Sequence, residues 1–344
     1  MRILVTGSAG FIGFHVSSKL LDLGYTVVGF DNLNSYYDVE LKQARLEHLL
    51  ERDQFHFVKG SLENRSDLEQ LFEEHRFQVV IHLAAQAGVR YSLEHPQTYI
   101  DSNVTGFLNI LEMCRIHQIG HLLYASSSSV YGANRKVPFS VEDMTDHPVS
   151  LYASTKKMNE MMAHAYSHIY GLPVTGMRFF TVYGPWGRPD MAYFSFTRNI
   201  LEEKPITVFN NGEMWRDFTY VDDVVQAIAN LIPLPPAPDS NWNGQTGSSN
   251  APYRIYNIGN HSPVKLMEMI NLLERHLGKK ARMEYRPMHP GDVEVTYADT
   301  KSLEEQVGFK PETPLDAGLG KFVSWYKAFY QVKGLELTKS ISGD

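Results

Sequence analysis

The sequence predicts an α/β protein with a doubly wound parallel sheet and a smaller C-terminal α/β lobe. Two observations support this prediction. Short β-branched runs alternate with longer amphipathic runs through the first half of the chain, a pattern typical of parallel strands joined by crossover helices. In addition, the first such run leads into a glycine-rich turn and then a helical pattern, in the segment 1–23.

The alternation assigns the elements in order. Strands are expected at 2–5, 26–30, 55–58, 79–83, 121–125 and 174–178, and helices at 11–23, 39–51, 67–75, 97–117 and 152–170. After Gly184 the alternation becomes irregular: helices are expected at 191–203 and 265–277, and a strand and helix at 217–232 that return to the main sheet. The Pro- and Ser-rich segment 233–252 is expected to be a loop.

These elements divide the chain into two domains. We expect residues 1–180, together with about 217–258, to form the sheet-containing domain, which carries the glycine-rich turn. Residues 181–216 and 259–344 are expected to form the smaller lobe.

Composition excludes several classes of function. The 344 residues carry a net charge of −7, without the basic stripe of a nucleic-acid-binding protein or a basic amphipathic segment for a membrane surface. The N-terminal apolar run is too short for a signal peptide, and no stretch approaches the ~20 apolar residues of a membrane span. We therefore expect a cytoplasmic protein with no nucleic-acid or membrane partner. Its single cysteine, Cys114, is expected to lie in the core.

The glycine turn reads Val5-Thr-Gly-Ser-Ala-Gly-Phe-Ile-Gly13. Glycines allow the backbone to turn sharply and approach a pyrophosphate, and the following helix offers unpaired N–H groups. Asp31 ends the second strand, where a carboxylate would bind the adenosine ribose diol and repel a 2′-phosphate. The alternative, that Asp31 caps a turn with Asn32, is left open. The pattern predicts a Rossmann site for NAD, with contacts from Gly7, Gly10, Phe11, Ile12, Gly13, Asp31 and Asn32.

A tyrosine and a lysine on one helix face supply a candidate base. In Tyr152-Ala-Ser-Thr-Lys156 the two side chains are four residues apart, and the cation is expected to lower the pKa of the phenol. The same spacing in Tyr297-Ala-Asp-Thr-Lys301 comes too late in the chain to reach the cofactor sheet, and is expected to be a surface turn or a helix start. His164 and His168 have metal-ligand spacing but no evident third ligand, so no metal site is predicted.

Together the motifs resemble those of the extended short-chain dehydrogenase/reductase family. The resemblance is carried by the glycine turn, His82-Leu-Ala-Ala85, Asn103 in Asp-Ser-Asn-Val-Thr-Gly, Ser-x-x-Val-Tyr-Gly132, the Tyr152 pair, Arg216-Asp-Phe-Thr-Tyr-Val-Asp-Asp223 and Pro290-Gly-Asp292. It implies that Tyr152 is the catalytic base, with Lys156 as its electrostatic partner and Ser127 bonded to the reacting sugar oxygen. It also implies a homodimer, cofactor contacts from Ser61, Leu62, Leu83, Ala84, Ala85 and Asn103, and contacts to a UDP-sugar from Arg216 and Arg286.

The segment 179–192 resembles that of UDP-glucuronate 4-epimerases within the family. This resemblance implies C4 epimerisation through a 4-keto intermediate, with Ser128, Ser129, Thr181 and Arg188 near the substrate carboxylate. Related dehydratases and decarboxylases carry acids where Ser128 and Ser129 stand. The alternatives are a UDP-glucose/UDP-galactose 4-epimerase, a UDP-glucuronate decarboxylase and, in a different class, a non-enzymatic NAD sensor.

Overall fold

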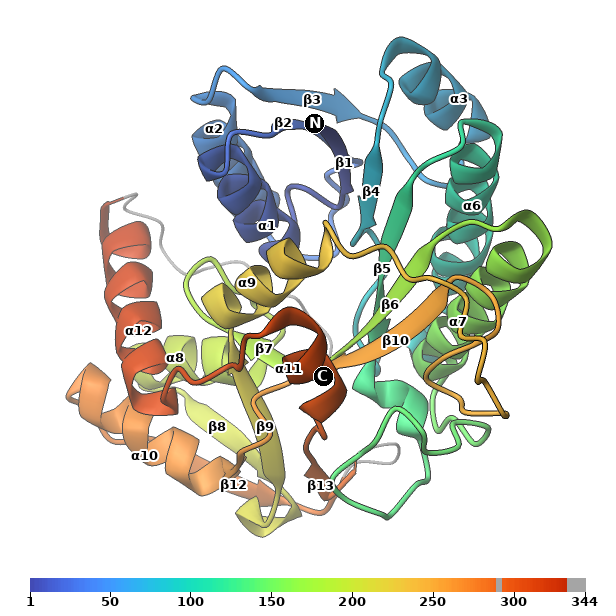
Figure 1. The fold of residues 1–344 in the computed structure, drawn as a ribbon. Helices are drawn as coiled ribbons and strands as arrows, with labels where there is room; N and C mark the ends of the chain where they lie inside the picture. The colour runs from blue at the N-terminus through green and yellow to red at the C-terminus, as the bar shows by residue number, and fades with distance from the viewer. Residues whose placement is uncertain (289–292, 333–344) are drawn as a thin grey trace.

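A computed structural model describes residues 1–288 and 293–332, and Figure 1 shows its large parallel sheet. Seven strands pair in parallel in the order β10, β6, β5, β4, β1, β2, β3. Their bounds are Tyr253–Ile258, Val174–Phe179, His121–Ser127, Val79–His82, Arg2–Thr6, Thr26–Asp31 and Phe55–Lys59. The strand order reverses between β1 and β4, which confirms the predicted doubly wound fold.

Helices cover both faces of the sheet (Figure 1). In β1, Ile3 and Val5 belong to one buried cluster and Leu4 to another, because successive strand residues point to opposite faces. The first cluster contains side chains of α1 (Phe11–Asp22), α2 (Val39–Leu50) and α9 (Val221–Leu231). The second contains side chains of α3 (Arg65–Glu74), α6 (Gly106–Ile116) and α7 (Leu151–Tyr170).

The helix expected at 97–117 is interrupted. A short helix, α5 (Pro96–Tyr99), leads into a π-helical stretch (Ile100–Thr105), and only then does α6 begin. Asn103 lies in the π-helical stretch and is buried, and π-helical turns of this kind often occur at functional sites.

The second lobe is built on two small sheets. One contains β7 (Thr181–Tyr183), β9 (Trp215–Tyr220), β11 (Pro263–Lys265) and β13 (Val295–Thr296), and the other pairs β8 (Pro205–Phe209) with β12 (Arg282–Arg286). Around them lie α8 (Ala192–Leu201), α10 (Leu266–Leu277) and α12 (Leu315–Val332). Two short helices pack on the large-sheet domain instead: α4 (Tyr91–Glu94) contacts α5 and α7, and α11 (Lys301–Val307) contacts β10 and α9.

The prediction that the strand of segment 217–232 joins the main sheet is wrong. β9 pairs with β7, β11 and β13 in the second lobe, and the seventh place in the main sheet, beside β6, is taken by β10. The helix of the same segment, α9, does return to the main sheet and packs against α1. One segment therefore contributes to both lobes.

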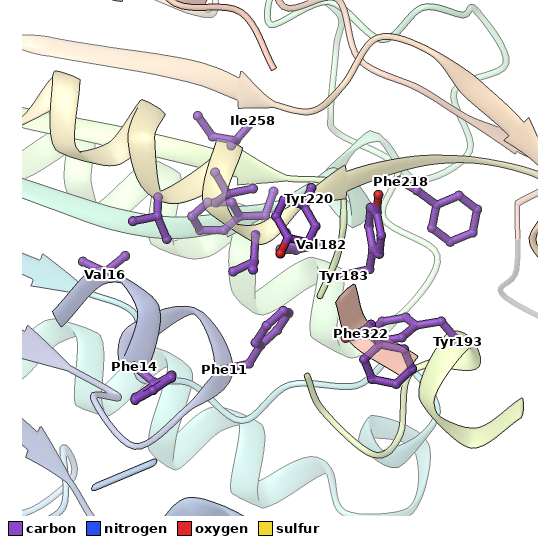
Figure 2. Close-up of a cluster of buried hydrophobic side chains, with 14 of the residues drawn as sticks. Phe11, Phe14, Val16, Val182, Tyr183, Tyr193, Phe218, Tyr220, Ile258 and Phe322 are labelled. Carbon is purple, nitrogen blue, oxygen red and sulfur yellow. The ribbon is translucent and has the colours of Figure 1, made fainter. Parts of the chain in front are cut away.

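A shared core joins the two lobes. Figure 2 shows Phe11 and Phe14 of α1 in the same buried cluster as Val182 and Tyr183 of β7 and Phe322 of α12. Burial of aromatic side chains from both lobes removes apolar area from water and so resists their separation. Among the helices of residues 1–288 and 293–332, none is both long and apolar enough to span a bilayer.

Candidate active site

A cavity of about 820 Å³ is lined by both lobes. Its wall includes the glycine turn after β1, the residues after β4, the serine run at the end of β5 and residues of α8 and β8. The cavity therefore lies at the carboxyl ends of β1 and β4, where the strand order reverses and where ligands bind in doubly wound sheets.

The glycine turn forms a cradle that only backbone can occupy. Gly7 has φ of +74°, and a Cβ on it would lie 2.7 Å from the amide nitrogen of Ala84. A Cβ on Gly13 would lie 2.0 Å from the carbonyl oxygen of Gly7. Gly10 caps α1 without a side-chain hydrogen bond, so the N–H groups of the first helical turn remain available to an anion. This turn fits the pyrophosphate of a dinucleotide, and Phe11 and Ile12 also line the cavity.

Asp31 lines the cavity and also organises the loops around it. Its Oδ2 accepts a hydrogen bond from the N–H of Ala9 over 3.1 Å, and its Oδ1 accepts one from the N–H of Leu33 over 2.8 Å. Asp31 thus caps the turn that contains Asn32, as the alternative interpretation holds, and it lines the cavity as well. A carboxylate fixed by two N–H donors is preorganised to accept ribose hydroxyls.

Of the predicted cofactor contacts near Asp31, two line the cavity and one does not. Asn32 and Leu62 line the cavity. Ser61 is absent from the lining residues: its Oγ accepts a hydrogen bond from Nδ2 of Asn32 over 3.3 Å, and its N–H donates to Asp67. In this structure Ser61 therefore supports Asn32.

The wall after β4 contains Leu83, Ala84 and Ala85, the residues for which cofactor contacts are predicted. Asn103 lies behind this wall and is 1% exposed. Its Nδ2 donates to the carbonyl oxygen of Gln86 over 3.0 Å and to Oγ1 of Thr155 over 3.2 Å. Its Oδ1 accepts from the N–H of Gln86 over 2.8 Å. The amide thus connects the wall to α7.

Tyr152, Lys156 and Ser127 all line the cavity. Nζ of Lys156 donates to the carbonyl oxygen of Ala125 over 2.9 Å, and burial lowers the pKa of this lysine to about 8. Burial raises the pKa of Tyr152, while a hydrogen bond with Ser127 and the charge of Arg188 oppose that rise. On balance the pKa of Tyr152 is thus raised and not lowered as expected, because removal of the phenol from water has the largest effect in the protein without bound ligands.

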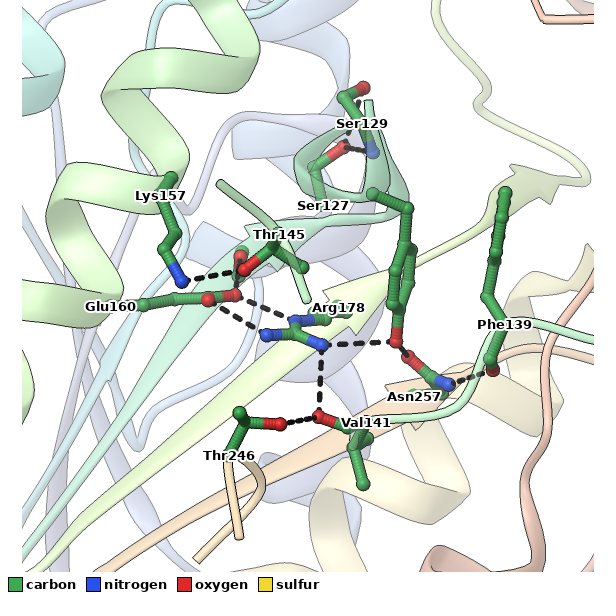
Figure 3. A network of polar contacts seen from close by, with 12 residues as sticks. Ser127, Ser129, Phe139, Val141, Thr145, Lys157, Glu160, Arg178, Thr246 and Asn257 are labelled. Atoms are coloured by element: carbon green, nitrogen blue, oxygen red, sulfur yellow. Dashed lines mark hydrogen bonds and ion pairs between the residues drawn. The ribbon is translucent and has the colours of Figure 1, made fainter. Parts of the chain in front are cut away.

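The serine run bends into the cavity at the end of β5. The hydroxyl of Ser127 donates to Oγ of Ser129 over 3.0 Å and accepts from its N–H over 3.2 Å (Figure 3). A 3₁₀ turn (Ser128–Tyr131) follows. Ser128, Ser129 and Thr181 all line the cavity, so three hydroxyl groups from two strand ends face the same space.

Arg188 lines the cavity, where Asp190 holds its guanidinium. Nε and Nη2 of Arg188 donate to the two carboxylate oxygens of Asp190 over 3.0 and 2.8 Å. Tyr36 adds a hydrogen bond from its hydroxyl to Asp190 over 3.2 Å. The carboxylate raises the pKa of Arg188 although burial opposes the charge, so this arginine stays protonated.

The two arginines predicted for the smaller lobe differ in position. Arg216 lines the cavity, and its Nη1 donates to the carbonyl oxygens of Trp215 and Glu294 over 2.8 and 3.0 Å. Arg286 is absent from the lining residues and lies 3.6 Å from Glu284 in an exposed ion pair. The motif Pro290-Gly-Asp292 lies outside the described residues.

Sequence reasoning missed two buried cations of α2. Lys42 lines the cavity, is 5% exposed and donates from Nζ to the carbonyl oxygen of Asn34 over 2.6 Å. Burial lowers its pKa to about 8. Arg45 is fully buried, and its guanidinium donates to the carbonyl oxygens of Ala9 and Trp186. Each lies four residues from a buried leucine, Arg45 after Leu41 and Lys42 before Leu46, and this spacing is the signal that could have placed both on the inner face.

The discounted motifs lie elsewhere. The second tyrosine–lysine pair sits at the start of α11, where Tyr297 accepts a backbone hydrogen bond from Phe139 and Lys301 begins the helix. Nε2 of His164 bonds to Oγ of Ser249 over 2.8 Å. Among residues 1–288 and 293–332, no group of three or more His, Cys, Asp or Glu side chains is arranged to hold a metal ion.

Comparison with known proteins identifies several relatives. The sequence profile of the NAD dependent epimerase/dehydratase family matches residues 3–259. Protein CapI of Staphylococcus aureus is 55% identical over 334 residues, which cover 96% of this chain and 100% of that protein. UDP-glucuronate 4-epimerase 1 of Arabidopsis thaliana is 51% identical over 335 residues, which cover 96% of this chain and 77% of the plant protein.

A solved structure is also similar over nearly the whole chain. The UDP-glucuronic acid 4-epimerase of Bacillus cereus, crystallised with UDP-glucuronic acid and NAD, superposes with a TM-score of 0.85 at 32% identity. The match covers 96% of this chain and 100% of the Bacillus chain. The similarity thus includes both lobes that line the cavity.

Proposed function

Because this chain belongs to the NAD dependent epimerase/dehydratase family, we propose that it interconverts UDP-glucuronate and UDP-galacturonate by C4 epimerisation. The observation that carries the proposal is the serine run. Ser127, Ser128 and Ser129 face a cavity that also contains Tyr152 and Lys156, and the run itself contains no acid. Such a site can move a proton at the sugar hydroxyl but offers no carboxyl group there for elimination chemistry.

The roles of the catalytic residues follow from their positions. Tyr152 takes the proton of the sugar 4-hydroxyl and later returns it, and Ser127 holds the same oxygen by a hydrogen bond. Lys156, buried and bonded to Ala125, stabilises the phenolate by its charge. NAD, when bound, accepts hydride from C4 and returns it to the opposite face, so that none is consumed.

The cofactor contacts proposed for the glycine turn rest on its shape. Gly7, Gly10 and Gly13 would hold the pyrophosphate against the first turn of α1. Asp31 would accept the adenosine ribose hydroxyls, and its charge favours NAD over NADP. The remaining proposed contacts are Phe11, Ile12, Asn32, Leu62, Leu83, Ala84 and Ala85, which line the cavity.

The substrate carboxylate is proposed to bind where three hydroxyls converge. Ser128, Ser129 and Thr181 line the cavity, and each can donate a hydrogen bond to a carboxylate. Arg188 supplies a positive charge, tempered by Asp190. In the smaller lobe, Arg216 is the arginine on the cavity wall proposed to meet the diphosphate.

Two further elements of the proposal are the assembly and the location. We propose a homodimer formed through α6 and α7, because large apolar side chains are exposed there: Leu108 (41%), Ile116 (47%), Met158 (40%) and Met161 (62%). Light scattering during gel filtration measures the mass, and a monomer would contradict the proposal. We also propose a cytoplasmic location, because the protein would meet its nucleotide-sugar substrate there.

The test of the proposed reaction is direct. The purified protein is incubated with UDP-glucuronate and followed by proton NMR, and UDP-galacturonate is the expected product. Formation of UDP-xylose would identify a decarboxylase. Conversion of UDP-glucose to UDP-galactose without turnover of UDP-glucuronate would identify the other epimerase.

A further inference from the structure

Ser126, the first residue of the serine run, has a hydroxyl that the proposed reaction does not use. Its side chain is 2% exposed, and its Oγ donates to Oε1 of Glu160 over 2.7 Å. Glu160 is 3% exposed and lies four residues after Lys156 on α7. A buried hydrogen bond to a carboxylate therefore connects the end of β5 to the helix that carries Tyr152.

Glu160 is in turn held by a second buried charge (Figure 3). Nε and Nη2 of Arg178 donate to its two carboxylate oxygens over 2.8 and 2.9 Å. Nη1 of Arg178 donates to the hydroxyl of Tyr131 over 3.0 Å, and that hydroxyl donates to Oδ1 of Asn257 over 2.6 Å. When the buried polar groups of a network all hydrogen-bond to one another, the network strongly favours one arrangement of the strands and helices that its side chains come from.

The elements joined by this network also carry the groups that face the sugar. Tyr152 lies two helical turns before Glu160 on α7. Ser127 follows Ser126 directly, and Thr181 follows Arg178 by three residues. The relative positions of the proposed base and the proposed carboxylate ligands therefore depend on hydrogen bonds among side chains that are almost fully buried.

We propose that Ser126 and Glu160 are positioning residues. By fixing the groups that hold the substrate carboxylate, they keep the C5–C6 bond of the 4-keto intermediate from aligning with the carbonyl π system. The inference rests on the proposed function. The intermediate of a uronic acid is a β-keto acid, which loses carbon dioxide when its C5–C6 bond lies parallel to the carbonyl π system. Fixing the serine run against α7 limits rotation of the carboxylate held by Ser128 and Ser129.

The side reaction that this arrangement suppresses has a defined balance. The C5–C6 bond breaks, its electron pair forms the C4–C5 enolate, and carbon dioxide leaves. A proton from water then adds at C5 and gives UDP-4-ketopentose. The hydride removed from C4 has not been returned, so each such event leaves one reduced nicotinamide unless the ketopentose is itself reduced to a UDP-pentose.

The experiment compares Ser126→Ala with Ser167→Ala. Ser167 is a matched control because it lies on α7, is 0% exposed, and its hydroxyl has no hydrogen-bond partner among the described residues. Each holoenzyme is incubated with UDP-glucuronate. NMR measures the ratio of decarboxylated product to UDP-galacturonate, and calorimetry measures the affinities for UDP-glucuronate and UDP-glucose.

Ser126→Ala is expected to raise the decarboxylated fraction by about tenfold, the order of effect of one lost buried hydrogen bond. It is also expected to lower the ratio of the affinity for UDP-glucuronate to that for UDP-glucose. Ser126→Thr keeps a hydroxyl and should bring the decarboxylated fraction and the affinity ratio most of the way back to the wild-type values. Ser167→Ala should match the wild type in both. Glu160→Gln keeps the side-chain shape and should shift both readouts in the direction of Ser126→Ala.

Two results would overturn the inference. In one, Ser126→Ala and Glu160→Gln are folded but leave both ratios at the wild-type values. In the other, Ser167→Ala changes the ratios as much as Ser126→Ala does, which would show that any buried change in this region is sufficient. A wild-type protein that forms no UDP-galacturonate would instead refute the proposed function, so the two failures are distinct.

Discussion

Nη2 of Arg45 donates to the carbonyl oxygen of Trp186 over 2.6 Å, while its Nη1 donates to the carbonyl oxygen of Ala9 over 2.9 Å. Ala9 belongs to the glycine turn, and Trp186 precedes Arg188 by two residues. The side chain of Trp186 packs against Phe14 and Trp325, with ring centroids 5.5 and 5.2 Å away. One buried guanidinium therefore joins the proposed cofactor cradle to the segment that carries Arg188, which lines the cavity and is proposed to face the substrate.

Replacement of Arg45 by Lys is expected to weaken the binding of NAD and of UDP-glucuronate together. A lysine ammonium cannot reproduce the fork geometry that reaches two carbonyl groups. We expect the affinities for NAD and for UDP-glucuronate each to fall by about tenfold, consistent with the loss of a charged hydrogen bond, as measured by calorimetry. Arg52→Lys is the control, because Arg52 lies just beyond the same helix in an exposed ion pair with Asp22. A loss confined to one ligand would contradict the joining role.

Replacement of Gly13 by Ala should abolish NAD retention. The added methyl would lie 2.0 Å from the carbonyl oxygen of Gly7, so the turn must move away from the helix N-terminus. The measurement is the amount of NAD released from purified protein on denaturation. Gly24→Ala is the control: Gly24 has φ of +80° but open space around it, and this change should cost about 1–2 kcal/mol of stability without loss of NAD. NAD retained by the Gly13 variant would show that the turn does not hold the pyrophosphate.

Replacement of Lys156 by Met should stabilise the ligand-free fold while stopping turnover. Burial lowers the pKa of Lys156 to about 8, below the value of about 10.4 in an unfolded chain. The buried charge therefore reduces stability fully below pH 8, and this penalty disappears as the pH rises from about 8 to about 10.4. At pH 7 we expect the variant to be more stable by about 1–3 kcal/mol, after the loss of the hydrogen bond to Ala125.

Denaturant unfolding at several pH values tests this expectation. The stability difference between Lys156→Met and the wild type should shrink between pH 8 and pH 10. Lys157→Met is the matched control, since Lys157 is the next residue of α7 but is only half-buried, with its Nζ bonded to Thr145 and 3.8 Å from Asp146. A constant difference across this range would show that Lys156 is not the titrating group.

Replacement of Tyr152 by Phe distinguishes the enzyme from an NAD sensor. Loss of the base is expected to reduce turnover of UDP-glucuronate by about 10²–10⁴-fold, with NAD retained because the glycine turn is untouched. The readouts are NMR of the product and the NAD content of the purified protein. A non-enzymatic sensor would show no turnover in the wild type and would respond to NAD equally well in both forms.

The elements of the parallel sheet were predictable because their signal is local. β1 to β6 each appear within two residues of the predicted bounds, since buried parallel strands read as short β-branched runs. The glycine turn and Asp31 were predictable for the same reason, because the turn directly follows β1 and Asp31 is the last residue of β2. β9 was misplaced because a strand's pattern states that it is buried and extended, but not which neighbour it pairs with.

The sequence by itself determined the strand–helix alternation, the cradle for a dinucleotide and the tyrosine–lysine helix face, because each depends on residues close together in the chain. The tertiary structure alone decided that Arg45 reaches Trp186, 141 positions away, that Asn103 lies behind the cavity wall, and that Ser61 bonds to Asn32 instead of lining the cavity. It also decided that burial raises the pKa of Tyr152. Desolvation and long-range hydrogen bonds depend on which distant segments cover a group, and no local pattern contains that information.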